Sequence, residues 1–135
     1  MTGWKRWWIF TLVGVLGFAL QLTLLFLIKR FLGVPYLVAT VLAVEAAVLH
    51  NFVWHEHLSW ADVTSSRRDR TMRRLVRFHL ANGLISICGN ASLTWGLVET
   101  LHFPYLAANA AAVAACSAMN YVACDKFVFA DPPGV

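Results

Sequence analysis

Acidic side chains are scarce in this chain, which has seven Asp and Glu residues among 135, against eleven Lys and Arg. The acids are scattered, so no pair of carboxylates is spaced for general acid–base catalysis and no Ser-His-Asp arrangement is recognisable. His55-Glu56-His57 is not the HExxH pattern of a zinc enzyme, and no fourth ligand stands at a recognisable spacing. These absences predict a protein that is not an enzyme and that holds neither a metal nor a cofactor.

Cysteine is also rare, and the three cysteines have no CxxC spacing. Cys88, Cys116 and Cys124 all fall in or beside apolar segments, which predicts small packing residues rather than disulfides or metal ligands.

The first apolar segment lacks a small-x-small cleavage site before Lys29. We therefore expect that segment to be a retained helix rather than a signal peptide.

Apolar residues dominate the chain, at 59% of the sequence with a mean hydropathy of +0.63. A membrane-spanning helix needs about 20 mostly apolar residues. Four stretches meet this requirement: 8–28, 37–55, 78–98 and 104–124. The sequence therefore predicts an all-α membrane protein with four transmembrane helices in a single domain over residues 1–135.

Two halves of the chain repeat each other at an offset of 69 residues. Residues 34–39 recur as 103–108, and Asn51-Phe52-Val53 recurs as Asn120-Tyr121-Val122. Each copy contains two apolar stretches, so both copies enter the membrane from the same side. We expect two parallel-repeat helical hairpins, at about 8–60 and 78–130, joined by a basic cytoplasmic loop at 61–77.

Basic residues fix the expected orientation. Only Lys29 and Arg30 fall on the side of the outer turns. The side of the termini and the middle loop carries the other nine: Lys5, Arg6, Arg67, Arg68, Arg70, Arg73, Arg74, Arg77 and Lys126. By the positive-inside rule, both termini then face the cytoplasm, and the protein lies in the cytoplasmic (inner) membrane. The arginines of the loop fit either an amphipathic segment on the inner leaflet or a solvated loop.

A polar stripe follows the third apolar stretch. His79, Asn82, Ser86, Asn90 and Thr94 recur at intervals of three or four residues, so they share one face of a helix. Such a face avoids lipid, and it points either to other helices, as hydrogen-bonding contacts, or to a wet cavity. Both alternatives remain open from the sequence.

A pair of motifs at the cytoplasmic ends carries a family resemblance. Each motif is an Asn-aromatic pair followed about seven residues on by an aromatic, often with basic residues between, in 51–60 and again in 120–129. Together with Val13-Gly14 and Arg77-Phe78, these motifs make residues 8–130 resemble the GtrA family of small four-helix membrane proteins. The resemblance implies a role in moving polyprenyl-phosphate-linked sugars across the cytoplasmic membrane for cell-surface polysaccharide synthesis. The first motif departs from the family pattern, because Glu56 stands where basic residues are usual.

The resemblance directs attention to two groups of residues. A lipid-linked phosphate needs cations or amide donors at the inner interface, and the sugar needs a polar groove. The candidates for phosphate binding are Lys126, Arg74, Arg77, Asn51 and Asn120. The candidates for the sugar groove are Gln21, Asn82, Ser86, Asn90 and Asn109. The alternative is that the cations only set the topology and anchor the protein at the headgroups, and that the amides only hold the helices together.

The remaining expectations concern Glu45 and the partners. Glu45 falls near mid-membrane, where a carboxylate is costly, so we expect proton or polar coupling or a hydrogen-bonded place in the bundle.

Helix four is rich in alanine, which favours close packing and a homo-oligomer, most simply a dimer. The expected partners are the lipid-linked sugar and membrane lipids, with no nucleic acid. Two alternative functions are an accessory protein that recruits a membrane glycosyltransferase and a proton-coupled drug transporter.

Overall fold

The computed structural model describes residues 1–64 and 70–130, except for the side chains of residues 36, 37, 105 and 106. Every element in this described part is a helix. Arg67 and Arg68 of the predicted basic loop lie outside the described residues. The chain divides into two compact units, Met1–Ser66 and Arg67–Val135, and the division falls within the predicted loop.

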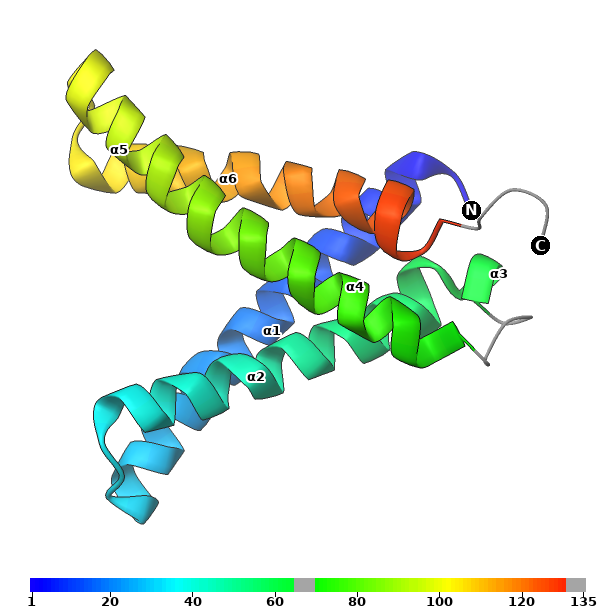
Figure 1. Ribbon diagram of the computed structural model, residues 1–135, viewed down its shortest axis with the longest axis horizontal. Helices are drawn as coiled ribbons and strands as arrows, with labels where there is room; N and C mark the ends of the chain where they lie inside the picture. Colours follow the sequence, from blue (N-terminus) through cyan, green and yellow to red (C-terminus); the bar gives the residue numbers. More distant parts are fainter. Residues whose placement is uncertain (65–69, 131–135) are drawn as a thin grey trace. The chain divides into compact units, whose positions relative to one another are not determined.

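The first unit is a helical hairpin, named hairpin one here (Figure 1). Its long first helix, α1 (Gly3–Leu32), packs along α2 (Tyr36–Trp54). The second helix continues as a π-helical turn, η1 (His55–Ser59), and a short helix, α3 (Ala61–Thr64), follows.

The second unit, hairpin two, is built in the same way. Its first arm consists of α4 (Thr71–Leu84), the π-helical η3 (Ile85–Gly89) and α5 (Asn90–Leu101). The backbone is right-handed helical at both junctions, so the arm is one continuous helix. The return arm consists of α6 (Tyr105–Ala123) and the π-helical η4 (Cys124–Val128), and it packs along the first arm.

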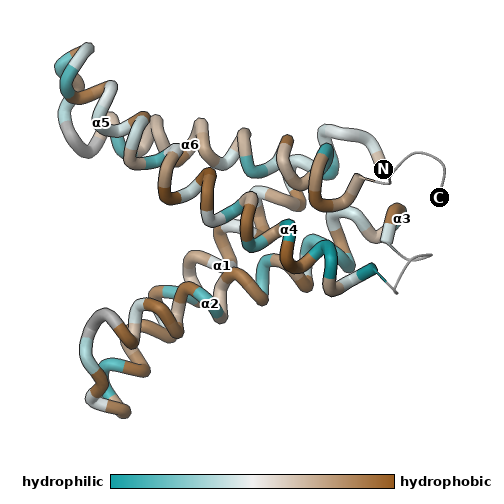
Figure 2. Tube along the Cα trace, viewed as in Figure 1, coloured by the Kyte–Doolittle hydropathy of each residue, from teal (hydrophilic) through white to brown (hydrophobic). Residues whose placement is uncertain are grey.

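Three helical segments are long and apolar enough to cross a membrane: Gly3–Leu32, Val38–Ser59 and Ala107–Val128. They contain most of the residues of the predicted stretches 8–28, 37–55 and 104–124, and Figure 2 shows their hydrophobic colouring. The fourth predicted span, 78–98, lies within the first arm of hairpin two, and its crossing of the membrane stays a prediction. Residues 71–77, which carry the basic residues nearest this span, form the first turns of α4.

The backbone repeats at the same offset of 69 as the sequence. Each return arm begins after a proline, Pro35 or Pro104, and each first arm ends at a left-handed residue, Gly33 or His102. Each return arm also ends in a π turn that closes with a 2.9 Å bond from a backbone N–H to the carbonyl five residues earlier. The duplication therefore extends from the residues to the turns and helix ends.

A seam of small side chains holds each hairpin together. In hairpin one, Ala39, Ala43 and Ala47 are buried on one face of α2. The residues at offset 69 in α6 are also buried, namely Ala108, Ala112 and Cys116. Small residues four apart allow two helix backbones to approach closely, which is how helices associate in lipid.

Cys116 shows how close this approach is in hairpin two. Its thiol lies 3.6 Å from the carbonyl oxygen of Ile85, and a Cβ added at Gly89 would lie 3.1 Å from its sulfur. Cys116 is a free, buried cysteine that packs against the facing helix. Glycine at position 89 leaves room for the sulfur.

Replacing Ala112 with leucine should destabilise the protein by about 1–3 kcal/mol, because extra methylenes would enter a closely packed seam. Val113→Leu is the matched control, since Val113 is the next residue along α6 and is half exposed. It should change stability by less than about 0.5 kcal/mol. Unfolding of both variants in detergent checks this, and equal losses would show that the seam does not hold the hairpin.

Candidate functional site

An open groove of about 540 Å³ runs along hairpin two. One wall is a face of η3 and α5, and α6 contributes a single residue to the lining. At 1.5 Å per residue, the lined part of the first arm is about 20 Å long. The lining residues are Ser86, Ile87, Asn90, Ala91, Thr94, Trp95, Val98, Glu99 and Asn109.

The groove brings together three of the five residues predicted to contact the sugar, Ser86, Asn90 and Asn109. Thr94, from the same predicted stripe, lies with them, and its hydroxyl is 3.4 Å from the side-chain oxygen of Asn90. Ser86 of the stripe lies in the π-helical turn η3, which interrupts the regular α-helix. Breaks of this kind inside α-helices are frequent at functional sites.

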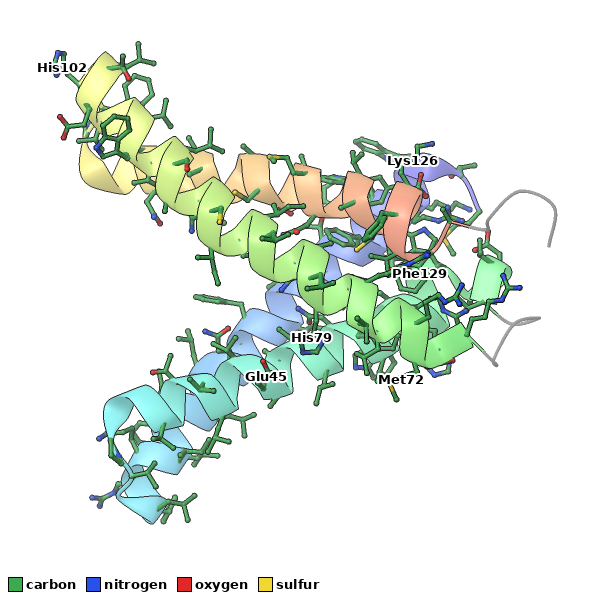
Figure 3. The ribbon with its side chains drawn as sticks, viewed as in Figure 1. Glu45, Met72, His79, His102, Lys126 and Phe129 are labelled. Carbon is green, nitrogen blue, oxygen red and sulfur yellow. The ribbon has the colours of Figure 1, made fainter. Side chains whose placement is uncertain are left out.

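Two other groove candidates and Glu45 lie elsewhere. Asn82 is half-buried in α4 and does not line the groove. Gln21 is half-buried in α1, so it belongs to hairpin one. Glu45 is exposed on α2, about midway along the helix (Figure 3). The roles predicted for Gln21, Asn82 and Glu45 stay predictions.

Basic residues gather at the end of hairpin two that is opposite the turn. Figure 3 marks Lys126 at this end and His102 at the other. Lys126 lies on η4, with 78% of its side chain exposed and its ammonium 3.7 Å from Asp125. Arg77 of α4 reaches η4, donating a 3.3 Å hydrogen bond to the carbonyl of Phe127 and lying over its ring. This end can therefore present cations to an anionic headgroup.

Arg74 stands one turn before Arg77 and is buried, with 7% of its surface exposed. Its guanidinium donates a 3.1 Å hydrogen bond to the hydroxyl of Thr71 in the same helix. Arg74 is therefore packed inside the structure, whereas the side chain of Lys126 is exposed. Of these two predicted phosphate ligands, Lys126 is the more accessible.

The two asparagines of the repeated motif differ in their surroundings. Asn51 packs its amide against Gly17 of α1, where an added Cβ would collide with the amide, and His50 lies 3.2 Å away. Asn120 instead has a buried side-chain oxygen with no hydrogen-bond partner among the described residues. The two asparagines therefore occupy equivalent positions in the sequence but make different contacts in the structure.

The end of hairpin one is closed by an aromatic cluster. His55 stacks on Phe10 with ring centroids 4.5 Å apart, and Trp60 packs edge-on against both. Arg6 lies over Trp60 and donates a 2.7 Å hydrogen bond to Asp62. His55 also lies 3.1 Å from the hydroxyl of Ser59. His55 therefore serves packing.

Sequence reasoning missed five of the nine lining residues, and two of these five, Trp95 and Glu99, carry an indole ring and a carboxylate. Trp95 and Glu99 both lie toward the turn on α5, five and nine residues beyond Asn90. Comparison of the two repeats contains a signal for them, because Glu99 stands where hairpin one has Arg30. The whole groove offers amides and hydroxyls for neutral hydrogen bonding, with one carboxylate near the turn.

The two asparagines should respond differently to replacement by leucine. Asn51→Leu should destabilise the protein by about 1–3 kcal/mol, because a branched side chain does not fit against Gly17. Asn120→Leu should be close to neutral, since it removes a buried oxygen that lacks a partner. Unfolding of the two variants in detergent measures both effects, and equal losses would contradict the difference.

Comparison with known proteins bears on the whole of this architecture. A family model described as "GtrA/DPMS, transmembrane domain" matches residues 9–129. The chain is also 32% identical over 113 residues to a protein named dolichol-phosphate mannosyltransferase from Pyrococcus furiosus. That match covers 84% of this chain and 30% of the relative, so the chain spans less than a third of the relative's length. The predicted GtrA resemblance is confirmed, and the chain belongs to the GtrA/DPMS transmembrane domain family.

Proposed function

We propose that this protein moves a polyprenyl-phosphate-linked sugar across the cytoplasmic membrane for cell-surface polysaccharide synthesis, with the sugar passing along the groove of hairpin two. The observation that carries the proposal is the polar lining of this groove in a largely apolar chain. Ser86, Asn90 and Asn109 line it together, on facing helices. Buried polar groups are costly in a membrane unless they have partners, and a sugar supplies many.

The basic end of hairpin two supplies the second part of the proposed path. Lys126 is exposed there, and Arg77 lies beside it on the facing helix. Charge-assisted hydrogen bonds to a phosphate are about twice as strong as neutral ones. These two residues hold the phosphate in the proposal, and the prenyl tail stays in lipid. The roles predicted for Arg74, Asn51 and Asn120 as phosphate ligands stay predictions.

The relative from Pyrococcus furiosus supports the substrate class, because its name contains both dolichol phosphate and mannose transfer. Dolichol is a polyprenol, so that protein's named substrate is a polyprenyl phosphate. The matched segment is less than a third of the relative. The same observation favours a second candidate function, in which this chain recruits a membrane glycosyltransferase and moves nothing itself.

The proposal includes four crossings, with both termini on the cytoplasmic side. It treats α4, η3 and α5 as the remaining membrane helix, because together they form one helix of about 45 Å, longer than the hydrocarbon core of about 30 Å. Nine of the eleven basic residues then face the cytoplasm. Reporters fused after Val135 and inserted at 61–66 should both report cytoplasm, and a periplasmic signal from either would overturn this topology.

The proposal assigns no chemical step to the chain, and it includes association of copies, most simply a dimer. Ala111 and Ala115 of α6 are exposed, which leaves small side chains available for a second copy. The mass of the protein in detergent tests this association, and a monomer would contradict it.

Glu45, exposed on α2, is retained as the candidate for proton or polar coupling.

Transport in liposomes tests the function directly. The purified chain should move a labelled polyprenyl-phosphate sugar between leaflets, scored by its accessibility from each side. Asn90→Leu should slow passage by at least about tenfold while binding persists, because the groove loses an amide that the sugar needs. Lys126→Ala should weaken binding by about threefold to tenfold, the size of one exposed charge-assisted contact.

Lys29→Ala is the matched control for Lys126→Ala, since Lys29 is exposed at the far end of hairpin one. It should leave both binding and passage unchanged. A correctly inserted Asn90→Leu protein that transports at the wild-type rate would place the path outside this groove. A wild-type protein that binds a glycosyltransferase but moves no lipid would favour the recruiting function.

A further inference from the structure

The half of the groove nearest the turn has a distinct chemistry. Trp95 and Glu99 line it, and both side chains are exposed, Trp95 at 69%. Asn109 of α6 lines the groove with them. This half therefore combines an indole ring, a carboxylate and an amide.

The charge of this half excludes phosphate as its occupant. Among the described residues that line the groove, Glu99 is the one ionisable group, and no lysine, arginine or histidine accompanies it. A phosphate is held most strongly by cations, which the described lining of this half lacks, and a facing carboxylate repels it. The cations of hairpin two instead lie at the other end, around Arg77 and Lys126.

A sugar without an acid group matches the lining. Its ring has an apolar C–H face that an indole can cover, and its hydroxyls donate hydrogen bonds that a carboxylate accepts. Glu99 makes no hydrogen bond or ion pair with another side chain in the described part of the chain. Its oxygens are therefore available to such hydroxyls.

The fold does not require these side chains. At offset 69 in hairpin one, Phe26 stands in place of Trp95 and Arg30 in place of Glu99. Hairpin one nevertheless has the same turn, the same seam of small residues and the same helix ends. The carboxylate is thus particular to the arm that carries the groove.

We infer that Glu99 determines the specificity of the groove, admitting neutral or amino sugars and rejecting acidic ones. This inference rests on the proposed function, because it assigns the groove to the sugar of a lipid-linked substrate. An acidic sugar would bring a second carboxylate against Glu99, and like charges that face each other disfavour binding. A neutral sugar meets a hydrogen-bond acceptor at the same place.

Two matched substrates test this in the full-length protein. Polyprenyl-phosphate glucose and polyprenyl-phosphate glucuronic acid differ only at C6, where the second carries a carboxylate. Vesicles of phosphatidylethanolamine and phosphatidylglycerol containing the protein should move the glucose form at least about tenfold faster, given the cost of facing like charges. Glu99→Gln keeps the shape of the side chain and removes its charge, so it should reduce this ratio by at least about fivefold.

Arg30→Gln is the matched control, because it removes a charge at the equivalent position of hairpin one. It should leave the ratio of the two rates unchanged. Unfolding in detergent checks that Glu99→Gln is folded. A wild-type protein that moves both lipids equally, or a Glu99→Gln protein that keeps the wild-type ratio, would overturn the inference and leave the proposed function standing.

Binding of the same two lipids to the detergent-solubilised protein separates the two proposals. If the protein moves neither lipid but binds the glucose form more tightly, and Glu99→Gln removes that preference, the specificity inference stands and transport fails. Without any preference in binding or in transport, the assignment of Glu99 is overturned.

Discussion

Close contact between helices through small side chains is the constraint on which the rest of each hairpin depends. In lipid there is no hydrophobic driving force between helices, so association relies on packing and hydrogen bonds. Buried alanines four residues apart supply this contact in α2 and again in α6. A seam of this kind fixes the relative rotation of two helices, and the rotation decides which of the remaining side chains meet and which form a groove.

Once the seam is set, the other faces of the two hairpins can diverge. Hairpin one uses its free end for an aromatic cluster around His55 and Trp60, closed by the contact of Arg6 with Asp62. Hairpin two leaves its corresponding end basic, with Lys126 exposed. The same backbone thus supports an aromatic cluster at the end of one copy and the contact of Arg77 with Phe127 beside an exposed Lys126 at the end of the other.

The sequence was sufficient for the repeat, for three helices long and apolar enough to cross a membrane, and for the polar face of the third apolar stretch, because all of these follow from composition and periodicity. It was insufficient for the full groove. The predicted stripe used the 3.6-residue period of a regular α-helix, and the π turn at 85–89 changes that phase. Asn82, before the turn, falls outside the groove, whereas Ser86, Asn90 and Thr94 of the stripe line it. Trp95 and Glu99 lie off the stripe on the regular helix α5, so the 3.6-residue period did not select them. The unequal settings of Asn51 and Asn120 depend on tertiary packing, which identical motifs do not encode.

The distance between the charged ends of hairpin two constrains any passage along it. Arg77 and Glu99 lie on one continuous arm, separated by about 33 Å at 1.5 Å per residue. A sugar phosphate is far shorter than this, so one headgroup does not reach the cations and the carboxylate together. A headgroup held by Lys126 and Arg77 extends its sugar only toward Ser86 and Asn90, and contact with Glu99 requires the phosphate to leave the basic end. In the proposed transport, the arrangement of charges therefore requires two successive occupied states, with release from the cations as the step between them.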